Sequence, residues 1–137
     1  MKLFARPNPA TPKRTVLVVD DDGRVRAMLL AWFEAQDLDV AAAADGEEAL
    51  ALLRRREYYV VICDLLMPKM TGDELFRICR EERLEVASRF IFLTGGCRGL
   101  PPVDFAVNSG QPFLSKPFRL TELQAAIDQI TCPLVVT

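Results

Sequence analysis

The sequence predicts a doubly wound α/β fold, in which a five-stranded parallel sheet carries helices on both faces. Two short runs of mostly β-branched residues, 15–19 and 60–63, are typical of strands that are covered on both sides. Segments with the apolar spacing of amphipathic helices alternate with such runs along the chain. Strands that alternate with helices form repeated right-handed crossovers, which place one parallel sheet between two helical layers.

The expected elements can be placed in chain order. Strands are predicted over residues 15–19, 38–43, 60–64, 89–93 and 112–115. Polar residues or prolines mark the expected helix starts, near Asp22, Asp45, Thr71, Pro101 and Thr121. Two of these starts, Asp45 and Thr71, have a glutamate three residues later, which is the spacing of a capping box. The first helix has one apolar stripe, expected to face the sheet, which consists of Val25, Met28, Leu29, Trp32 and Phe33.

The composition fits one compact domain. Of the 137 residues, 50% are apolar and 26% are charged, so we expect a single domain. The formal net charge of −2 provides no basic excess for a nucleic-acid backbone, and we expect no direct nucleic-acid binding. The chain has no histidine, which excludes histidine-dependent triads, histidine-ligated metals and a phosphohistidine within it. Its chemistry must therefore use carboxylates, hydroxyls and lysine.

The ordered domain is predicted over residues 15–131. Residues 1–14 contain three prolines and four basic side chains, so we expect a flexible N-terminal tail. Residues 132–137 are expected to form a C-terminal tail. The N-terminal segment lacks an apolar stretch long enough for a signal peptide or a membrane span, and we expect a cytoplasmic protein. The four separated cysteines are then expected to be free thiols.

Three consecutive arginines, Arg54–Arg56, end the predicted second helix. One interpretation is a binding patch for an anionic partner. The other, which we favour, is that cations in a last helical turn complement the helix dipole.

Several predicted strands end in side chains that can carry chemistry. In a parallel sheet the carboxyl ends of the strands lie at one edge, where such folds bind ligands. That edge is expected to gather Asp20, Asp21, Asp64, Thr94 and Lys116. Adjacent carboxylates repel one another unless a cation lies between them, so the run from Asp20 to Asp22 favours a hard divalent metal. Asp22 has a second explanation as the N-cap of the following helix.

Four motifs at these strand ends resemble those of the receiver domain of two-component response regulators. In chain order they are Val18-Val19-Asp20-Asp21, Asp64-Leu65-Leu66-Met67-Pro68-Lys69-Met70-Thr71-Gly72, Leu93-Thr94-Gly95 and Lys116-Pro117-Phe118. The resemblance covers about residues 15–130 and implies the flavodoxin-like fold of that family. The stretches after Leu93 and around Lys116 are also similar to receivers attached to hybrid histidine kinases.

The resemblance implies a role for each strand-end carboxylate. Asp64 matches the phosphoacceptor aspartate of the family, and Asp20 and Asp21 match its acidic pair. Together with the backbone carbonyl of Leu66, these three carboxylates are expected to hold Mg²⁺. The expected function is therefore to accept a phosphoryl group from a histidine kinase onto Asp64 and to change the surface of the domain in response.

Three further positions match residues through which the family transmits the signal. Thr94 matches the switch hydroxyl, Phe113 the switch aromatic, and Lys116 the lysine that contacts the phosphoacceptor and then the phosphoryl group. The resemblance implies a histidine kinase or histidine phosphotransfer protein as donor, and an effector domain or protein as target. We further expect a monomer or weak dimer. Phosphoryl transfer and dephosphorylation are expected to be self-catalysed, without turnover of a separate substrate as in an enzyme.

Two other classes share parts of this pattern. The run Val19-Asp20-Asp21-Asp22-Gly23 is also similar to the Asp-x-Asp nucleophile motif of haloacid dehalogenase phosphatases. That interpretation leaves the stretch from Asp64 to Gly72 unexplained and lacks an acidic pair after Lys116. A flavodoxin-like cofactor binder has the same topology, but three aspartates in the first loop would repel a flavin phosphate. A receiver that has lost phosphorylation is disfavoured because every motif position is filled.

Overall fold

The computed structural model describes residues 14–82, 84–95, 105–106 and 108–131. A five-stranded sheet lies at its centre and consists of β1 (Thr15–Val19), β2 (Asp39–Ala43), β3 (Val60–Asp64), β4 (Phe90–Thr94) and β5 (Phe113–Ser115). Neighbouring strands are parallel, in the order β2-β1-β3-β4-β5. The chain therefore leaves β1 in one direction to form β2 and then crosses back to add the other three strands.

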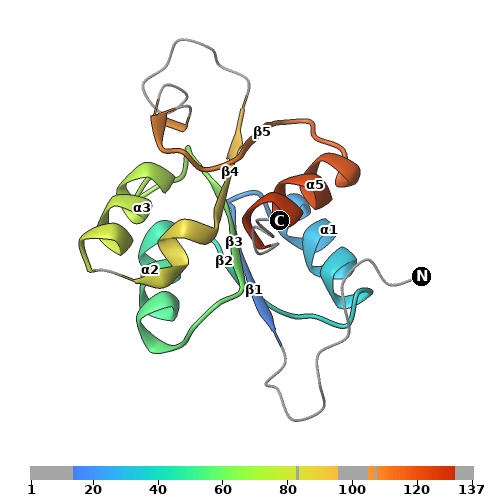
Figure 1. Cartoon of the computed structure of the whole chain (residues 1–137), viewed down its shortest axis with the longest axis horizontal. Coiled ribbons are helices and arrows are strands. Elements are labelled where there is room, and N and C mark those ends of the chain that lie inside the picture. Colours follow the sequence, from blue (N-terminus) through green and yellow to red (C-terminus); the bar gives the residue numbers. More distant parts are fainter. Residues whose placement is uncertain (1–13, 83, 96–104, 107, 132–137) are drawn as a thin grey trace, which may run out of the picture.

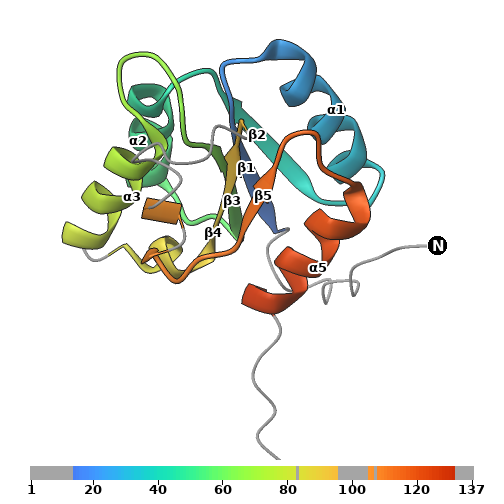
Figure 2. The same cartoon turned by 90° about the horizontal axis from the view of Figure 1, so that it is seen from above.

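Helices cover both faces of this sheet. They are α1 (Gly23–Glu34), α2 (Gly46–Arg55), α3 (Gly72–Glu81) and α5 (Leu120–Thr131), and a short 3-10 helix, η1 (Glu85–Arg89), precedes β4. Figures 1 and 2 show α2 and α3 on one face of the sheet and α1 and α5 on the other. The predicted doubly wound α/β fold is confirmed.

The sheet has a separate apolar core on each face, because successive side chains of a strand point in opposite directions. In β1, Leu17 and Val19 belong to the core under α2 and α3, whereas Val16 and Val18 belong to the core under α1 and α5. All four side chains are almost completely buried. The two faces of the central strands are thus occupied by packing, which leaves the strand ends for polar chemistry.

Side-chain caps fix the starts of the first two helices. Asp22 Oδ1 accepts a hydrogen bond from the Arg24 amide (2.9 Å), and Asp45 Oδ1 accepts one from the Glu48 amide (2.9 Å). These bonds satisfy amides that have no partner within their helices. Both predicted caps are confirmed.

The capping of the two later helices differs from the prediction, although α3 begins directly after Thr71 as expected. The Thr71 hydroxyl donates to the Glu74 carboxylate (3.0 Å) and makes no cap bond to the backbone of α3. Thr121 lies inside α5, which begins one residue earlier, so the predicted cap at Thr121 is wrong. The reason is that the Glu122 carboxylate accepts a hydrogen bond from the Arg119 amide (3.0 Å) and so secures the first turn.

The apolar stripe of α1 is narrower than its sequence spacing indicates. Leu29 and Phe33 lie in the core, and Val25 and Trp32 pack against it while partly buried. Met28 is 43% exposed, so its predicted place in the core is wrong. Met28 lies about 100° around the helix from Leu29, which turns its side chain away from the sheet.

Some expectations fall outside the described residues. They concern the N-terminal tail up to residue 13, the short helix expected to start at Pro101, and the C-terminal tail from residue 132. Cys97 and Cys132 also lie outside them. Cys63 and Cys79 are free and buried, as predicted.

Leu17→Ala is expected to lower the free energy of unfolding by about 2–5 kcal/mol, because it leaves a cavity in a fully buried part of the core. Met28→Ala is the matched control, since this apolar side chain is exposed at the surface and lies outside the core. The control should change the free energy of unfolding by less than about 1 kcal/mol. Urea unfolding of both variants measures the difference, and equal losses would contradict the assigned core.

Candidate functional site

The carboxyl end of β1 holds Asp20 in a fixed position. Its backbone amide donates to the Ala43 carbonyl of β2 (3.2 Å), and its own carbonyl accepts a bond from Arg26 Nη1 (2.6 Å). Its side-chain Oδ1 accepts a bond from the Asp22 amide (2.9 Å). Because Asp20 is also fully buried, its carboxylate has little freedom to move.

Asp64 closes β3, and Lys116 connects it electrostatically to Asp20. Lys116 Nζ lies 2.8 Å from Asp20 Oδ2 and 3.2 Å from Asp64 Oδ2. The Lys116 amide donates to the Thr94 carbonyl (2.7 Å), and the peptide bond between Lys116 and Pro117 is cis. The family resemblance indicates the contact with Asp64, whereas the shorter contact with Asp20 emerges only from the structure.

The carboxylates of Asp20, Asp21 and Asp64 form a group that fits a metal ion. One oxygen from each residue lies within 4.8 Å of the others. Clustered carboxylate oxygens are suitable ligands for Mg²⁺ or Ca²⁺. Asp21 is exposed while the other two are buried, so the group opens to solvent on the Asp21 side. The three predicted carboxylates are together, and the ligand role of the Leu66 carbonyl stays a prediction.

The charges of this group are not fully compensated. Burial, and next the charge of Asp20, raise the pKa of Asp64 to about 6, although Lys116 acts in the opposite direction. Burial also opposes the charged form of Lys116, but the hydrogen bonds and attraction of Asp20 and Asp64 outweigh it and raise the pKa of Lys116. One ammonium thus faces two buried carboxylates, and a divalent cation would balance the excess negative charge.

The two predicted switch residues lie on neighbouring strands. Thr94 ends β4 and is buried, and its hydroxyl lies 3.4 Å from the Leu114 carbonyl and 3.5 Å from Ser115 Oγ. These distances are long for hydrogen bonds, so the hydroxyl is weakly held. Phe113 begins β5 and is 40% exposed. The Thr94 side chain is therefore inside the domain, and the Phe113 side chain is exposed at its surface.

Two close contacts position the loop that follows Asp64. A Cβ atom on Gly72 would lie 2.5 Å from the Asp64 carbonyl oxygen, so the start of α3 can approach the end of β3 only with glycine there. A Cβ atom on Gly46 would lie 2.8 Å from the Met70 carbonyl oxygen. The sequence motifs alone assign no role to either glycine. The available signal is that each is the first residue of a predicted helix, where a bare backbone permits close packing.

A comparison with family models decides what this site belongs to. The model described as "Response regulator receiver domain" matches residues 16–128. The chain belongs to this family. The matched range includes nearly all of the sheet and every residue of the site. The predicted membership of the receiver family is therefore confirmed.

Relatives of the receiver domain include larger proteins. The domain is 33% identical over 118 residues to the "Probable transcriptional regulator ycf27" of Porphyridium aerugineum. The alignment covers 86% of this chain and 48% of that protein. The chain thus spans about half the length of the curated relatives it matches.

Solved structures of receiver domains have the same fold. The crystal structure of FixJ-N matches with a TM-score of 0.77 and 29% identity, covering 93% of this chain and 100% of that one. The receiver domain of the sensor histidine kinase PA1611 from Pseudomonas aeruginosa PAO1 matches with a TM-score of 0.74 and 24% identity. That match covers 87% of this chain and 98% of the other, whose structure has a magnesium ion coordinated in the active site cleft.

Within the described parts of the chain, no helix of the receiver domain has both the length and the apolar character that a membrane crossing requires.

Stability without divalent cations is expected to fall as the pH rises from about 4 to about 6. The raised pKa of Asp64, about 6 against an ordinary 3.8, means that the folded state keeps a proton that the unfolded chain has released in this window. The stabilisation by this bound proton is complete below pH 3.8 and is lost above about pH 6. Asp64→Asn should remove this slope and unfold with a free energy about 1–3 kcal/mol higher at pH 7.

Chemical unfolding in EDTA across this pH range measures the effect. Asp128→Asn is the control, because this exposed aspartate lies on α5 away from the site. It should keep the wild-type slope. The same slope in Asp64→Asn as in the wild type would show that Asp64 is not the titrating group.

Gly72→Ala is expected to lower the free energy of unfolding by about 1–3 kcal/mol, because its Cβ would overlap the backbone of Asp64 and Leu65. Gly23→Ala is a matched control at the first residue of another helix, where the nearest atom to a Cβ is the flexible end of Arg26 at 3.4 Å. The control should be neutral or stabilising. Thermal unfolding distinguishes the two, and a harmless Gly72→Ala would refute the close contact.

Proposed function

We propose that this receiver domain accepts a phosphoryl group on Asp64, with Mg²⁺ held by Asp20, Asp21, Asp64 and the carbonyl of Leu66. One observation carries the proposal: Lys116 Nζ contacts both Asp20 and Asp64 beside the group of three carboxylates. A nucleophilic carboxylate, a cation able to contact phosphoryl oxygens and a suitable set of metal ligands thus occur in one small site. The magnesium ion in the related PA1611 receiver supports the choice of ion.

In the proposed transfer, an oxygen of Asp64 attacks the phosphorus of a phosphorylated histidine on the donor protein. The oxygen–phosphorus bond forms as the phosphorus–nitrogen bond breaks, and the histidine nitrogen keeps the electron pair of that bond. The attacking carboxylate and the phosphoryl oxygens are both negative, so their repulsion has to be reduced. Mg²⁺ supplies charge compensation when bound. Lys116, which already contacts Asp64, is positioned to move to a phosphoryl oxygen.

The proposed response begins at Thr94. A phosphoryl group on Asp64 offers the Thr94 hydroxyl a stronger acceptor than its present long contacts to β5. As the hydroxyl turns toward it, space opens on the β5 side of β4, and the exposed ring of Phe113 can move inward. The surface of β5 and its surroundings would then differ between the two states.

We infer the partners and the turnover from family membership. The donor would be a histidine kinase or a histidine phosphotransfer protein in the cytoplasm, and the target an effector domain or protein. A receiver of this type would act as a monomer or weak dimer. It would catalyse its own phosphorylation and dephosphorylation without a separate substrate.

The phosphatase interpretation has less support from the site. Its nucleophile motif would use Asp20 and Asp22 together. Asp22 instead caps α1 by accepting a bond from the Arg24 amide, and it is not part of the three-carboxylate group. Asp64, which that interpretation does not use, belongs to the three-carboxylate group and contacts Lys116.

Asp64→Asn is expected to abolish formation of a covalent phosphoryl adduct, because the amide cannot act as the nucleophile. Wild type and variant are incubated with Mg²⁺ and a small acyl-phosphate donor and then compared by intact mass. Asp128→Asn, which removes an exposed carboxylate of α5, is the matched control and should be labelled as the wild type is.

Asp20→Asn, tested in the same assay, distinguishes the receiver interpretation from the phosphatase interpretation. A receiver lacking this metal ligand should be labelled more slowly, and Asp64 should remain the labelled residue. If Asp64→Asn is still labelled, the assignment of the phosphoacceptor is wrong. If phosphate is released without an adduct and only Asp20 is needed, the protein is a phosphatase.

A further inference from the structure

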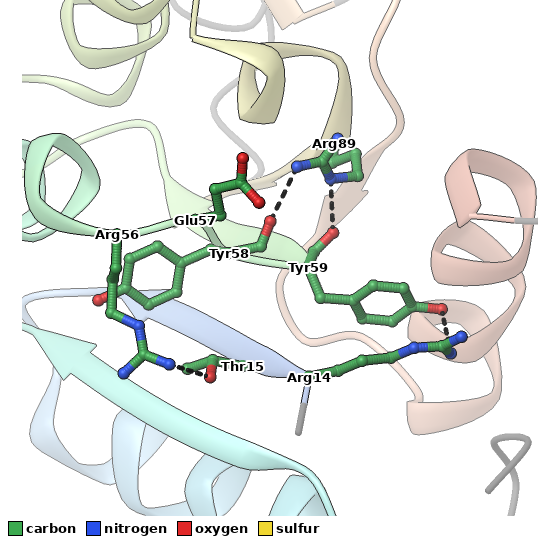
Figure 3. A pocket seen from close by; sticks show the side chains of 7 residues that line it. All are labelled: Arg14, Thr15, Arg56, Glu57, Tyr58, Tyr59 and Arg89. Atoms are coloured by element: carbon green, nitrogen blue, oxygen red, sulfur yellow. Dashed lines mark hydrogen bonds between the residues drawn. The ribbon is translucent and has the colours of Figure 1, made fainter. Parts of the chain in front are cut away.

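A polar pocket lies at the amino-terminal ends of the central strands, opposite the carboxyl ends that carry Asp20 and Asp64. It has a volume of about 450 Å³, and its lining includes Arg14, Arg56 and Arg89 together with Tyr58 and Tyr59 (Figure 3). The pocket is formed where β1, β3 and β4 begin, whereas the carboxylates lie where these strands end. A strand of five residues spans roughly 16 Å, so the pocket is separate from the proposed phosphorylation site.

Arg89 has a structural role in this pocket. Its Nε donates to the Tyr59 carbonyl (2.9 Å), and its Nη2 donates to the Tyr58 carbonyl (2.9 Å). The guanidinium thereby satisfies two carbonyls of the segment before β3 and fixes that segment against β4 (Figure 3). Its Nη1 also lies 3.5 Å from the Glu85 carbonyl oxygen, so Arg89 contributes positive charge but has fewer free donors than Arg14 and Arg56.

Arg14 and Arg56 are held in place and retain most of their donors. The Arg14 guanidinium lies 4.7 Å from the centre of the Tyr59 ring and donates one bond to its hydroxyl (3.3 Å). The Arg56 guanidinium lies 5.5 Å from the centre of the Tyr58 ring and donates one bond to Thr15 Oγ1 (2.7 Å). A guanidinium has five N–H donors, so each can bind a further acceptor without losing these contacts.

Positive charge in the pocket exceeds negative charge. Glu57 is the one acidic residue in its lining. Within the described ranges, no ion pair joins Arg14, Arg56 or Arg89 to a carboxylate, whereas Arg54 on α2 pairs with Glu82. The three consecutive arginines therefore have different surroundings. Arg54 and Arg55 lie in the last turn of α2, whereas Arg56 follows the helix and donates to Thr15. Helix-dipole compensation does not account for this side chain.

From this arrangement we propose that the pocket binds an acidic segment of a partner protein, through at least two carboxylates. Figure 3 shows Arg14 and Arg56 on opposite sides of the Tyr58–Tyr59 segment, which favours a ligand whose anionic groups are well separated over a single small anion. Arginine and tyrosine are among the residue types that most often anchor protein interfaces, and Arg14, Arg56 and Tyr59 retain accessible surface here. A nucleic acid is disfavoured because its repeated phosphates would extend beyond the basic pocket, over the surface of a chain whose net charge is −2.

The probe for this test is a hexaglutamate peptide, titrated into the isotope-labelled full chain without Mg²⁺ and followed by NMR. Amide shifts are expected at Thr15, Tyr58 and Tyr59 and not around Asp64. The double variant Arg14→Gln and Arg56→Gln should weaken binding by about five- to tenfold, because two exposed charge pairs are lost. Arg55→Gln is the matched control, since this neighbouring arginine is exposed and does not line the pocket; it should change binding by less than about twofold.

Several outcomes would overturn the proposal. Equal weakening by Arg55→Gln would indicate attraction to the general charge of the surface, and a hexaglutamine peptide that binds equally well would exclude recognition of carboxylates. Tighter binding of single-stranded DNA than of hexaglutamate would assign the pocket to nucleic acid. Amide shifts confined to the residues around Asp64 would show that the peptide does not bind in this pocket. The titration uses neither Mg²⁺ nor a phosphoryl donor, so its result does not depend on the proposed function of Asp64. If that function is also correct, the double variant should still be phosphorylated on Asp64.

Discussion

Two buried carboxylates that share one ammonium are the constraint on which the site depends. Asp20 and Asp64 are neighbours because β1 and β3 are adjacent parallel strands in which Val19 pairs with Cys63. Lys116 can reach both only because β5 is in parallel register with β4 and ends at the same edge. The charged group therefore requires the whole sheet to be assembled. Unfavourable electrostatics at this edge are offset by the apolar packing of the central strands on both faces.

This constraint would make the site responsive to a divalent cation. A pocket that already satisfied all its charges would gain little from a cation, whereas excess negative charge would give a divalent cation a strong differential interaction with the folded state. The hydroxyl of Thr94 is also incompletely satisfied, since its long contacts to Leu114 and Ser115 are easily replaced by a better acceptor. Rigid placement of the backbone and incomplete satisfaction of the side chains thus occur together at one edge of the sheet.

Much of this arrangement could be predicted from the sequence because β-branched runs locate buried strands and because parallel strands bring their ends together. That reasoning identified Asp20, Asp21, Asp64, Thr94 and Lys116 as neighbours. The contact between Lys116 and Asp20 could not be predicted, since it depends on side-chain reach across two intervening strands. Errors at Met28 and Thr121 have a similar origin: helical spacing gives the direction of a stripe but neither its width nor the residue that secures the first turn. The division of the arginine triplet follows from the backbone after α2, which the composition of the triplet does not reveal.

The shortness of β5 has a consequence for how copies of this domain can associate. Its three residues form one outer strand of the described sheet, and two of them are exposed. An outer strand normally offers unpaired backbone groups onto which another chain can add and extend the sheet. Here that template has room for only a few hydrogen bonds, and Ser115 is followed directly by the turn that carries Lys116. The addition of a strand from another molecule is thereby discouraged at β5. Contacts between copies on this side would have to rely on side chains instead of backbone hydrogen bonds.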